Sequence, residues 1–205
     1  MPVGVKLGFT NAAMLARRGL KDPVPGYLLR SMALPDGAVL DPRTLIRPRA
    51  EPEVAFRLAR PVAPDVPDAA LLVAIDAVAP AIEIVDSRYR DFQFTLPDVV
   101  ADNVSGCAFL TGRWQPPALE LGALRVEVYL DEACVATGGT DAILGHPLLA
   151  LRAALRLAVQ AGRPLQAGAL VMAGAATDPV ALRPGVRLRV RIDGLGQVST
   201  AMQAL

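Results

Sequence analysis

The decisive stretch of this sequence reads Glu51-Pro-Glu-Val-Ala-Phe-Arg-Leu-Ala59. From Glu53 to Ala59 the residues alternate as in a β-strand, and Pro61 closes the strand. Side chains two residues apart point to the same face of an extended chain, so the carboxylates of Glu51 and Glu53 lie together. The stretch therefore predicts a strand that carries two acidic groups on one face.

The rest of the chain, followed outward from this stretch, reads as many short strands and few helices. Two-residue turns at Asp131-Glu132 and Asp193-Gly194 indicate β-hairpins. Further strands are predicted at Val3–Phe9, Tyr27–Ala33, Thr44–Ile46, Val78–Val85, Cys107–Leu110, Leu124–Leu130, Ala133–Thr137, Leu170–Ala173, Val186–Ile192 and Val198–Ala201, and helices at Ala12–Arg18, Pro67–Ala77, Pro97–Asn103 and Pro147–Ala161. This pattern predicts an α+β fold, a mixed and mainly antiparallel β-roll.

Length and composition indicate one globular domain, residues 1–205, with 53% hydrophobic residues and a net charge of +1. The near-neutral charge gives no electrostatic reason to expect nucleic acid or an anionic membrane as a partner. The longest apolar runs, such as Ala69–Ile75 and Ala167–Ala173, are shorter than the ~20 residues that span a bilayer. Cys107 and Cys134 form no disulfide framework, and the N-terminus lacks the layout of a signal peptide, so we expect a cytoplasmic protein.

A third carboxylate stands out in Ala81-Ile-Glu-Ile-Val-Asp86, where Glu83 lies between two isoleucines. Alternation turns Glu83 to the face opposite those isoleucines. Together with Glu51 and Glu53 it offers all-oxygen ligation, which suits Mg²⁺ or Mn²⁺. Spacing alone leaves an alternative open, in which these carboxylates form salt bridges with Arg47, Arg49 and Arg88.

The basic residues are strongly biased, since 19 are Arg and only Lys6 and Lys21 are Lys. Arg does not deprotonate in proteins, whereas a desolvated Lys can. A retained Lys can therefore have a chemical role, although composition favours an ordinary surface residue for each.

Several motifs, in this order, resemble the 2-oxo acid hydratase/decarboxylase branch of the fumarylacetoacetate hydrolase superfamily. They are Arg49-Ala-Glu-Pro-Glu-Val-Ala-Phe56, Pro80-Ala-Ile-Glu-Ile-Val-Asp-Ser-Arg88, Leu96-Pro-Asp-Val-Val-Ala-Asp-Asn103, Leu144-Gly-His-Pro-Leu148 and Leu165–Thr177. The branch contains 2-keto-4-pentenoate hydratases and 4-oxalocrotonate decarboxylases of the meta-cleavage pathway. The resemblance extends from about Val5 to Ser199 and implies the family's mixed β-roll.

The resemblance also implies roles for individual residues. Glu51, Glu53 and Glu83 match the family's metal-binding carboxylates, and Lys6 matches its active-site lysine. Two further positions, Ser105 and Thr177, match residues that line the substrate pocket. The only histidine, His146, matches a segment that fixes the entry of a helix.

Two departures from the family pattern are visible. Family members carry a further N-terminal segment before the lysine motif, whereas this chain begins almost at that motif. Hydratases often have an acidic residue in the loop that reads Lys21-Asp-Pro-Val-Pro-Gly-Tyr27 here, and Val24 holds that place, with Asp22 nearby. An apolar residue at this position favours the decarboxylases.

These observations predict a metal-dependent lyase acting on an unsaturated 2-oxo acid, with 4-oxalocrotonate (2-oxo-3-hexenedioate) decarboxylase preferred over 2-keto-4-pentenoate hydratase. A non-catalytic homologue that serves as a partner subunit is an alternative of another class. The resemblance implies a small-molecule substrate and a homo-oligomer or a complex with the companion enzyme. No nucleic acid or membrane is expected as a partner.

Overall fold

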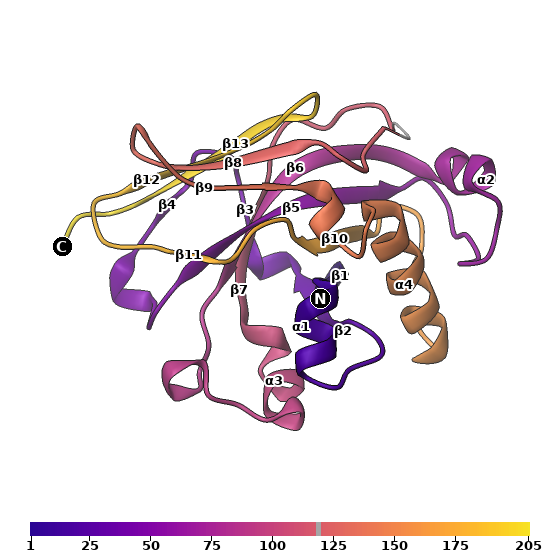
Figure 1. Ribbon diagram of the computed structural model, residues 1–205, viewed down its shortest axis with the longest axis horizontal. Helices are drawn as coiled ribbons and strands as arrows, with labels where there is room; N and C mark the ends of the chain where they lie inside the picture. Colours follow the sequence, from indigo (N-terminus) through magenta and orange to yellow (C-terminus); the bar gives the residue numbers. More distant parts are fainter. Residues whose placement is uncertain (118–119) are drawn as a thin grey trace.

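The computed structural model describes residues 1–117 and 120–205. Two twisted β-sheets lie one over the other, and four short or medium helices lie around them (Figure 1). The strands are β1 Pro2–Gly8, β2 Val24–Leu29, β3 Ala33–Leu34, β4 Val39–Leu40, β5 Arg49–Leu58, β6 Ile75–Val85, β7 Gly106–Thr111, β8 Arg125–Leu130, β9 Ala133–Gly139, β10 Leu170–Ala175, β11 Val180–Ala181, β12 Arg187–Ile192 and β13 Gly196–Met202. The helices are α1 Ala12–Arg17, α2 Asp68–Val73, α3 Leu96–Ala101 and α4 Pro147–Gln160.

The larger sheet has the strand order β2-β1-β10-β5-β6-β7-β3, and β11 adds to β5. The smaller sheet has the order β4-β13-β12-β8-β9. Most neighbouring strands of the described residues run antiparallel, and the parallel pairs are β1 with β10, β3 with β7 and β4 with β13. The predicted mixed, mainly antiparallel α+β fold is therefore confirmed.

One face of the larger sheet packs into the main core, and the other face carries the candidate site. Val54, Phe56, Ile82 and Ile84 point to one face and form the main core with the smaller sheet and α4. Their sequence neighbours point to the other face because side chains alternate along a strand. Glu53 and Glu83 are among these neighbours, and Glu51 shares the face of Glu53, so alternation separates the core from the candidate site.

Helix α4 covers one end of the main core, where Leu148, Leu151 and Leu155 are buried. The segment Thr140–Gln160 is the one part of the described chain that is long and apolar enough to cross a membrane, and half of its most apolar window is buried inside the fold. The α-helical part has 14 residues, about 21 Å at 1.5 Å per residue, and it packs against β10 and β1. Its apolar character is therefore accounted for by packing on the sheet.

Three predicted elements were wrong because a cap, a turn or a neighbouring strand occupies part of the predicted range. Thr44–Ile46 is not a strand, because Asp41 caps a 3-10 turn at Pro42–Thr44 by accepting a hydrogen bond from the Arg43 backbone N–H at 2.9 Å. The predicted helix Pro67–Ala77 ends at Val73, since Ile75 already belongs to the long strand β6. Similarly, the strand predicted at Tyr27–Ala33 is Val24–Leu29 followed by a 3-10 turn.

Candidate active site

Three carboxylates from two neighbouring strands meet on the outer face of the larger sheet. Glu51 lies directly opposite Glu83 in the antiparallel pairing of β5 with β6, and Glu53 lies two residues further along β5. One carboxylate oxygen from each of the three residues lies within 4.8 Å of the others. The structure thus brings together the three residues that the sequence singled out as metal ligands.

Burial and mutual repulsion make it unfavourable for all three carboxyl groups of this cluster to be ionised at once. Burial, followed by repulsion from Glu83, raises the pKa of Glu51 to about 7, against the opposing charges of Lys6 and Arg49. Burial and repulsion from both other carboxylates raise the pKa of Glu53 well above its usual range. Burial also raises the pKa of Glu83, and the adjacent Lys6 ammonium counteracts it. A divalent cation would relieve the same repulsion that protons relieve in its absence.

The hydrogen bonding of Glu53 shows that a metal ion fits between the three carboxylates. Its Oε2 accepts a hydrogen bond from the Gly174 backbone N–H at 2.6 Å. Its other oxygen, Oε1, is buried and has no hydrogen-bond partner among residues 1–117 and 120–205. A buried carboxylate oxygen without a partner is costly, and a hard cation between three carboxylates is the partner that this chemistry suits. The donor set fits a divalent ion such as Mg²⁺ or Mn²⁺.

Lys6 lies beside the carboxylates, on β1. Its side chain is 1% exposed, forms an ion pair with Glu83 and donates a hydrogen bond from Nζ to the Val104 backbone carbonyl at 2.8 Å. Two glycines leave room for it, because a Cβ on Gly26 or Gly106 would lie 2.9 Å or 3.1 Å from Lys6 Cε. The lysine is therefore held in one position by contacts on several sides.

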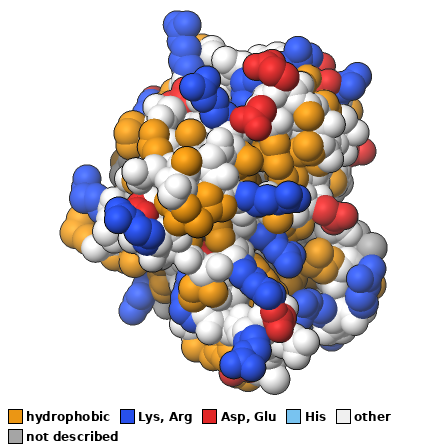
Figure 2. Space-filling view, turned by 90° about the vertical axis from the view of Figure 1, so that its left-hand side faces the viewer, with side chains coloured by type: hydrophobic (Ala, Val, Ile, Leu, Met, Phe, Trp, Pro, Cys, Tyr) orange, Lys and Arg blue, Asp and Glu red, His pale blue; other side chains and the backbone are white. Residues whose placement is uncertain are grey.

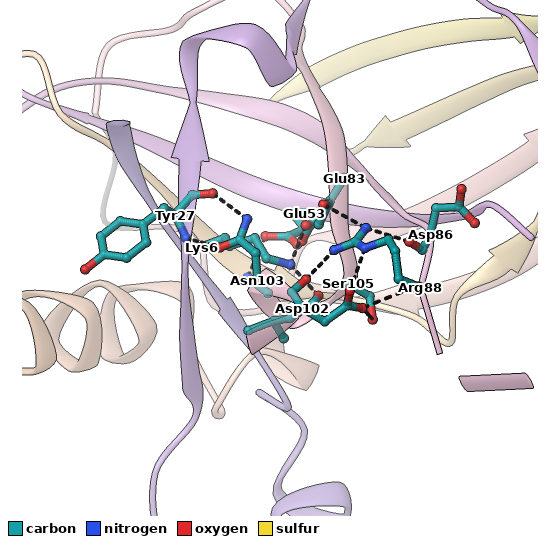
Figure 3. A network of polar contacts seen from close by, with 12 residues as sticks. Lys6, Tyr27, Glu53, Glu83, Asp86, Arg88, Asp102, Asn103 and Ser105 are labelled. Atoms are coloured by element: carbon teal, nitrogen blue, oxygen red, sulfur yellow. Dashed lines mark hydrogen bonds and ion pairs between the residues drawn. The ribbon is translucent and has the colours of Figure 1, made fainter. Parts of the chain in front are cut away.

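A tight turn, Asn103–Ser105, delivers the carbonyl that Lys6 contacts. Its three residues have φ angles of 52°, 52° and 57°, a left-handed conformation that is rare for a β-branched residue such as Val104. The Asn103 side chain fixes the turn by accepting from the Tyr27 backbone N–H at 2.7 Å and donating to the Tyr27 carbonyl at 3.0 Å (Figure 3). A network of hydrogen bonds thus holds a strained turn against the lysine.

The buried carboxylate of Asp102 supports the same turn from behind. It accepts hydrogen bonds from the hydroxyls of Ser87 and Ser105, both at 3.2 Å, and forms an ion pair with Arg88 at 2.5 Å (Figure 3). Asp102 lies within a motif that the sequence singled out, yet its residue type gave no sign of this role. Ser105 is therefore oriented by Asp102 rather than free to rotate.

A cavity of about 390 Å³ opens in front of these groups. Lys6, Glu51, Ser105 and Thr177 are part of its lining, which brings four of the predicted site residues to one space. Glu53 and Glu83 lie beneath it, fully buried. The rest of the wall is largely apolar and includes Phe9, Met14, Phe92, Phe94, Val99 and Val104.

Two arginines also line this cavity and were missed by sequence reasoning. The guanidinium of Arg49 lies 4.4 Å from the ring centre of Phe92. That of Arg18 lies 4.7 Å from the ring centre of Phe9 and 5.2 Å from that of Phe94. No sequence signal could have found these contacts, because each joins residues from separate segments.

The alternative of salt bridges to the three carboxylates is wrong for the arginines considered. Arg47 forms an ion pair with Asp91, and Arg88 forms one with Asp102. Arg49 stacks on Phe92, and its charge only lowers the pKa of Glu51 from nearby. In the described part of the chain, Lys6 is the cation that pairs with the cluster.

Neither Val24 nor Asp22 of the segment Lys21–Tyr27 lines the cavity. Val24 is buried against Val99 and Val104 and lies behind the cavity wall, not in its lining. Asp22 forms an exposed ion pair with Arg156 at 2.5 Å, also outside the lining. An apolar residue at position 24 therefore acts by backing the wall, and Asp22 does not substitute for a missing acid.

His146 has the structural role that was expected. Its Nδ1 accepts a hydrogen bond from the Leu148 backbone N–H at 3.0 Å, which caps the start of α4. It is not among the residues that line the cavity.

Residues 16–203 match the fumarylacetoacetate (FAA) hydrolase C-terminal family. The chain belongs to this family. The matched region contains five of the six predicted site residues, and Lys6 precedes it.

Relatives place the chain in the predicted branch. It is 45% identical over 197 residues to a 4-oxalocrotonate decarboxylase of Pseudomonas sp, which covers 96% of this chain and 77% of that protein. It is 39% identical to 2-keto-4-pentenoate hydratase 1 of Dechloromonas aromatica (strain RCB), over 96% of this chain and 76% of the relative. The prediction of a lyase of the decarboxylase/hydratase type is confirmed.

A solved structure supports the fold directly. The 4-oxalocrotonate decarboxylase of Pseudomonas putida G7, complexed with magnesium and adipate, superimposes with a TM-score of 0.91 at 35% identity. The match covers 98% of this chain and 78% of that one. The predicted fold of the fumarylacetoacetate hydrolase type is therefore confirmed.

Proposed function

We propose that this protein is a divalent-metal-dependent decarboxylase of 2-oxo-3-hexenedioate (4-oxalocrotonate). The observation that carries the proposal is the buried Glu51–Glu53–Glu83 cluster with its unpartnered Glu53 oxygen, at the base of a cavity that Lys6 also lines. The Pseudomonas putida G7 relative was solved with magnesium and adipate, a linear six-carbon dicarboxylate. Glu51, Glu53 and Glu83 would hold Mg²⁺ or Mn²⁺, and the ion would supply a Lewis acid that stabilises negative charge on the substrate.

The reaction needs negative charge to be stabilised at one oxygen. When the C5–C6 bond breaks, C6 leaves as CO₂ and the electron pair of that bond forms the C4–C5 double bond. The C3–C4 double bond moves to C2–C3, and the charge develops on the 2-oxo oxygen. One proton taken up there gives 2-hydroxy-2,4-pentadienoate. The catalytic problem is therefore to hold charge, and then a proton, at a single atom.

Lys6 suits this task because its Nζ is buried, ion-paired with Glu83 and fixed by the Val104 carbonyl. We assign to it the proton that the 2-oxo oxygen receives. Two residues of the cavity lining would position the substrate: Ser105, which Asp102 orients, and Thr177. The apolar wall excludes water, and desolvation of the departing carboxylate favours its loss as neutral CO₂.

Hydration of 2-hydroxy-2,4-pentadienoate is the second candidate, because both enzyme types occur among the relatives. Hydration requires a group that directs water onto a carbon, and the loop that could carry such an acid has Val24, packed behind the wall. Asp22 of the same loop pairs with Arg156 away from the cavity, so no acid of this loop faces the cavity, which favours decarboxylation. The test is to incubate the Mg²⁺-loaded protein with each substrate and measure CO₂ and 4-hydroxy-2-oxo acid; hydroxylated product without CO₂ would overturn the preference.

A non-catalytic partner subunit is the alternative of another class. Buried like charges destabilise a fold, so a protein without metal chemistry has no physical reason to keep three carboxylates together. Thermal unfolding with and without Mg²⁺ or Mn²⁺ distinguishes the two, because an active site gains stability from the ion. A protein that shifts with neither ion is a degenerate homologue.

We also propose a single catalytic domain over residues 1–205, a cytoplasmic location, and assembly as a homo-oligomer or as a complex with the companion enzyme. The free thiols of Cys107 and Cys134 agree with a reducing compartment. The surface face in Figure 2 has basic side chains spread among hydrophobic ones, with acidic ones between them. Light scattering of the purified protein, alone and with the companion enzyme, tests the assembly.

A further inference from the structure

Among the three cationic side chains of the cavity lining, Arg18 is the one without a compensating carboxylate in the described residues. Lys6 is paired with Glu83, and Arg49 acts on Glu51. Arg18 makes no ion pair with any described residue, including Asp178, the exposed acid of the same lining. An arginine aimed at a cavity without an internal partner is suited to an anionic ligand.

The position of this guanidinium is set by aromatic rings. Arg18 follows directly after α1, and its guanidinium lies over both Phe9 and Phe94. Phe9 comes from the end of β1 and Phe94 from the segment before α3, so two separate parts of the chain hold it. Stacking on rings leaves the edge of the guanidinium, with its N–H donors, free for a carboxylate.

The cavity also runs from a buried end to an exposed end. Lys6 and Glu83 are each 1% exposed, whereas Arg18 is exposed to solvent. Lys6 and Phe9 are three residues apart on one stretch of chain, so at most about 10 Å separates their Cα atoms. An extended six-carbon chain spans about as much as two extended residues, roughly 6–7 Å. This stretch is therefore long enough to lie alongside an extended six-carbon dicarboxylate.

We infer that Arg18 binds the carboxylate at the far end of the substrate and so selects dicarboxylic over monocarboxylic 2-oxo acids. This inference rests on the proposed function, in which the near end of the substrate meets the three glutamates. Arg49 is unsuited to the same task because it lies two residues before Glu51, on the same face of β5, and is thus tied to the buried end.

The inference has a kinetic signature, because the carboxylate that Arg18 holds is the one that leaves as CO₂. Its negative charge is lost as the reaction proceeds, so Arg18 stabilises the bound substrate at least as much as the transition state. Loss of Arg18 should raise KM for 2-oxo-3-hexenedioate while kcat stays unchanged or rises. A merely structural role would lower kcat along with stability.

The experiment compares Arg18→Gln with Arg17→Gln, a neighbouring exposed arginine that is not among the residues lining the cavity. Calorimetry of the Mg²⁺-loaded protein measures Kd for adipate and for hexanoate, which has the same length and one carboxylate. In wild type and Arg17→Gln, adipate should bind more tightly than hexanoate. In Arg18→Gln, adipate affinity should fall roughly tenfold to a hundredfold while hexanoate affinity is unchanged. The adipate preference of wild type should also weaken as salt rises.

An Arg18→Gln protein that keeps the adipate preference, or loses both ligands equally, overturns the inference. Arg18→Lys separates charge from geometry, since it keeps the cation and loses the planar stack; it should retain only part of the preference. The same measurements separate this inference from the proposed function. If the wild type prefers adipate through Arg18 but releases no CO₂ from 2-oxo-3-hexenedioate, the decarboxylase activity is refuted. If CO₂ is released and Arg18→Gln still prefers adipate over hexanoate, only the role of Arg18 is refuted.

Discussion

Replacing Glu51 by Gln should stabilise the metal-free protein at alkaline pH. The folded-state pKa of Glu51 is raised from 4.5 to about 7, so the folded state resists its ionisation. For a raised pKa, the stabilising contribution is complete below the unfolded value and is lost as pH rises through about 7. The shift corresponds to about 3 kcal/mol at pH 8, an upper bound because water in the cavity screens a partly exposed side chain. At pH 5, the raised pKa of Glu51 changes the free energy of unfolding by less than about 1 kcal/mol.

The assay is urea or thermal unfolding of chelator-treated wild type, Glu51→Gln and the exposed control Glu132→Gln. Glu51→Gln should gain stability over wild type between pH 5 and pH 8, by roughly 5–10 °C in Tm at pH 8. Mg²⁺ should reverse the order at pH 8, because wild type binds the ion and the variant has lost a ligand. Equal stability differences at both pH values would refute the reasoning about the buried cluster.

Three further predictions concern neighbouring parts of the site and fold. Lys6→Ala should abolish CO₂ release, while a Mg²⁺-induced rise in Tm persists; a variant with activity near wild type would exclude the lysine from catalysis. Gly26→Ala should lower kcat at least several-fold with little change in Tm, since the new Cβ lies 2.9 Å from Lys6 Cε, and unchanged kinetics would contradict the tight fit. His146→Ala should cost about 1 kcal/mol in urea unfolding through loss of the cap to Leu148, with KM and kcat intact, and a loss of kcat would point to a chemical role instead.

The local parts of the fold could be predicted from the sequence because they depend on neighbouring residues. Alternation gave β5 and β6, and the cap at His146 and the long apolar pattern gave α4. The pairing of Glu51 with Glu83 could not be derived from spacing, because strand register depends on residues far apart in the chain. In the sequence analysis, only the family resemblance placed Glu51 and Glu83 in the same metal site.

The parts of the site that escaped sequence reasoning depend on backbone shape and on rings from distant segments. The left-handed turn at Asn103–Ser105 contains no glycine, and although Asn103 tolerates a positive φ, nothing in the sequence predicts one for the β-branched Val104. The sequence could show that Val24 replaces an acidic residue, but not that β2 turns its side chain behind the cavity wall. The stacking of Arg18 on Phe9 and Phe94 arises only once three segments have assembled.

The parallel pairing of β1 with β10, in which Lys6 lies beside Met172, has a consequence for synthesis on the ribosome. Lys6 emerges 166 residues before Met172, which lies on the strand that pairs with β1. At about 5–20 residues per second, β1 waits roughly ten seconds or more with one edge unpaired. During that interval the nascent protein has neither its lysine in place nor the Gly174 N–H that holds Glu53. Activity should therefore appear only after β10 has emerged and paired, and the unpaired edge of β1 is the segment that chaperones need to shield until then.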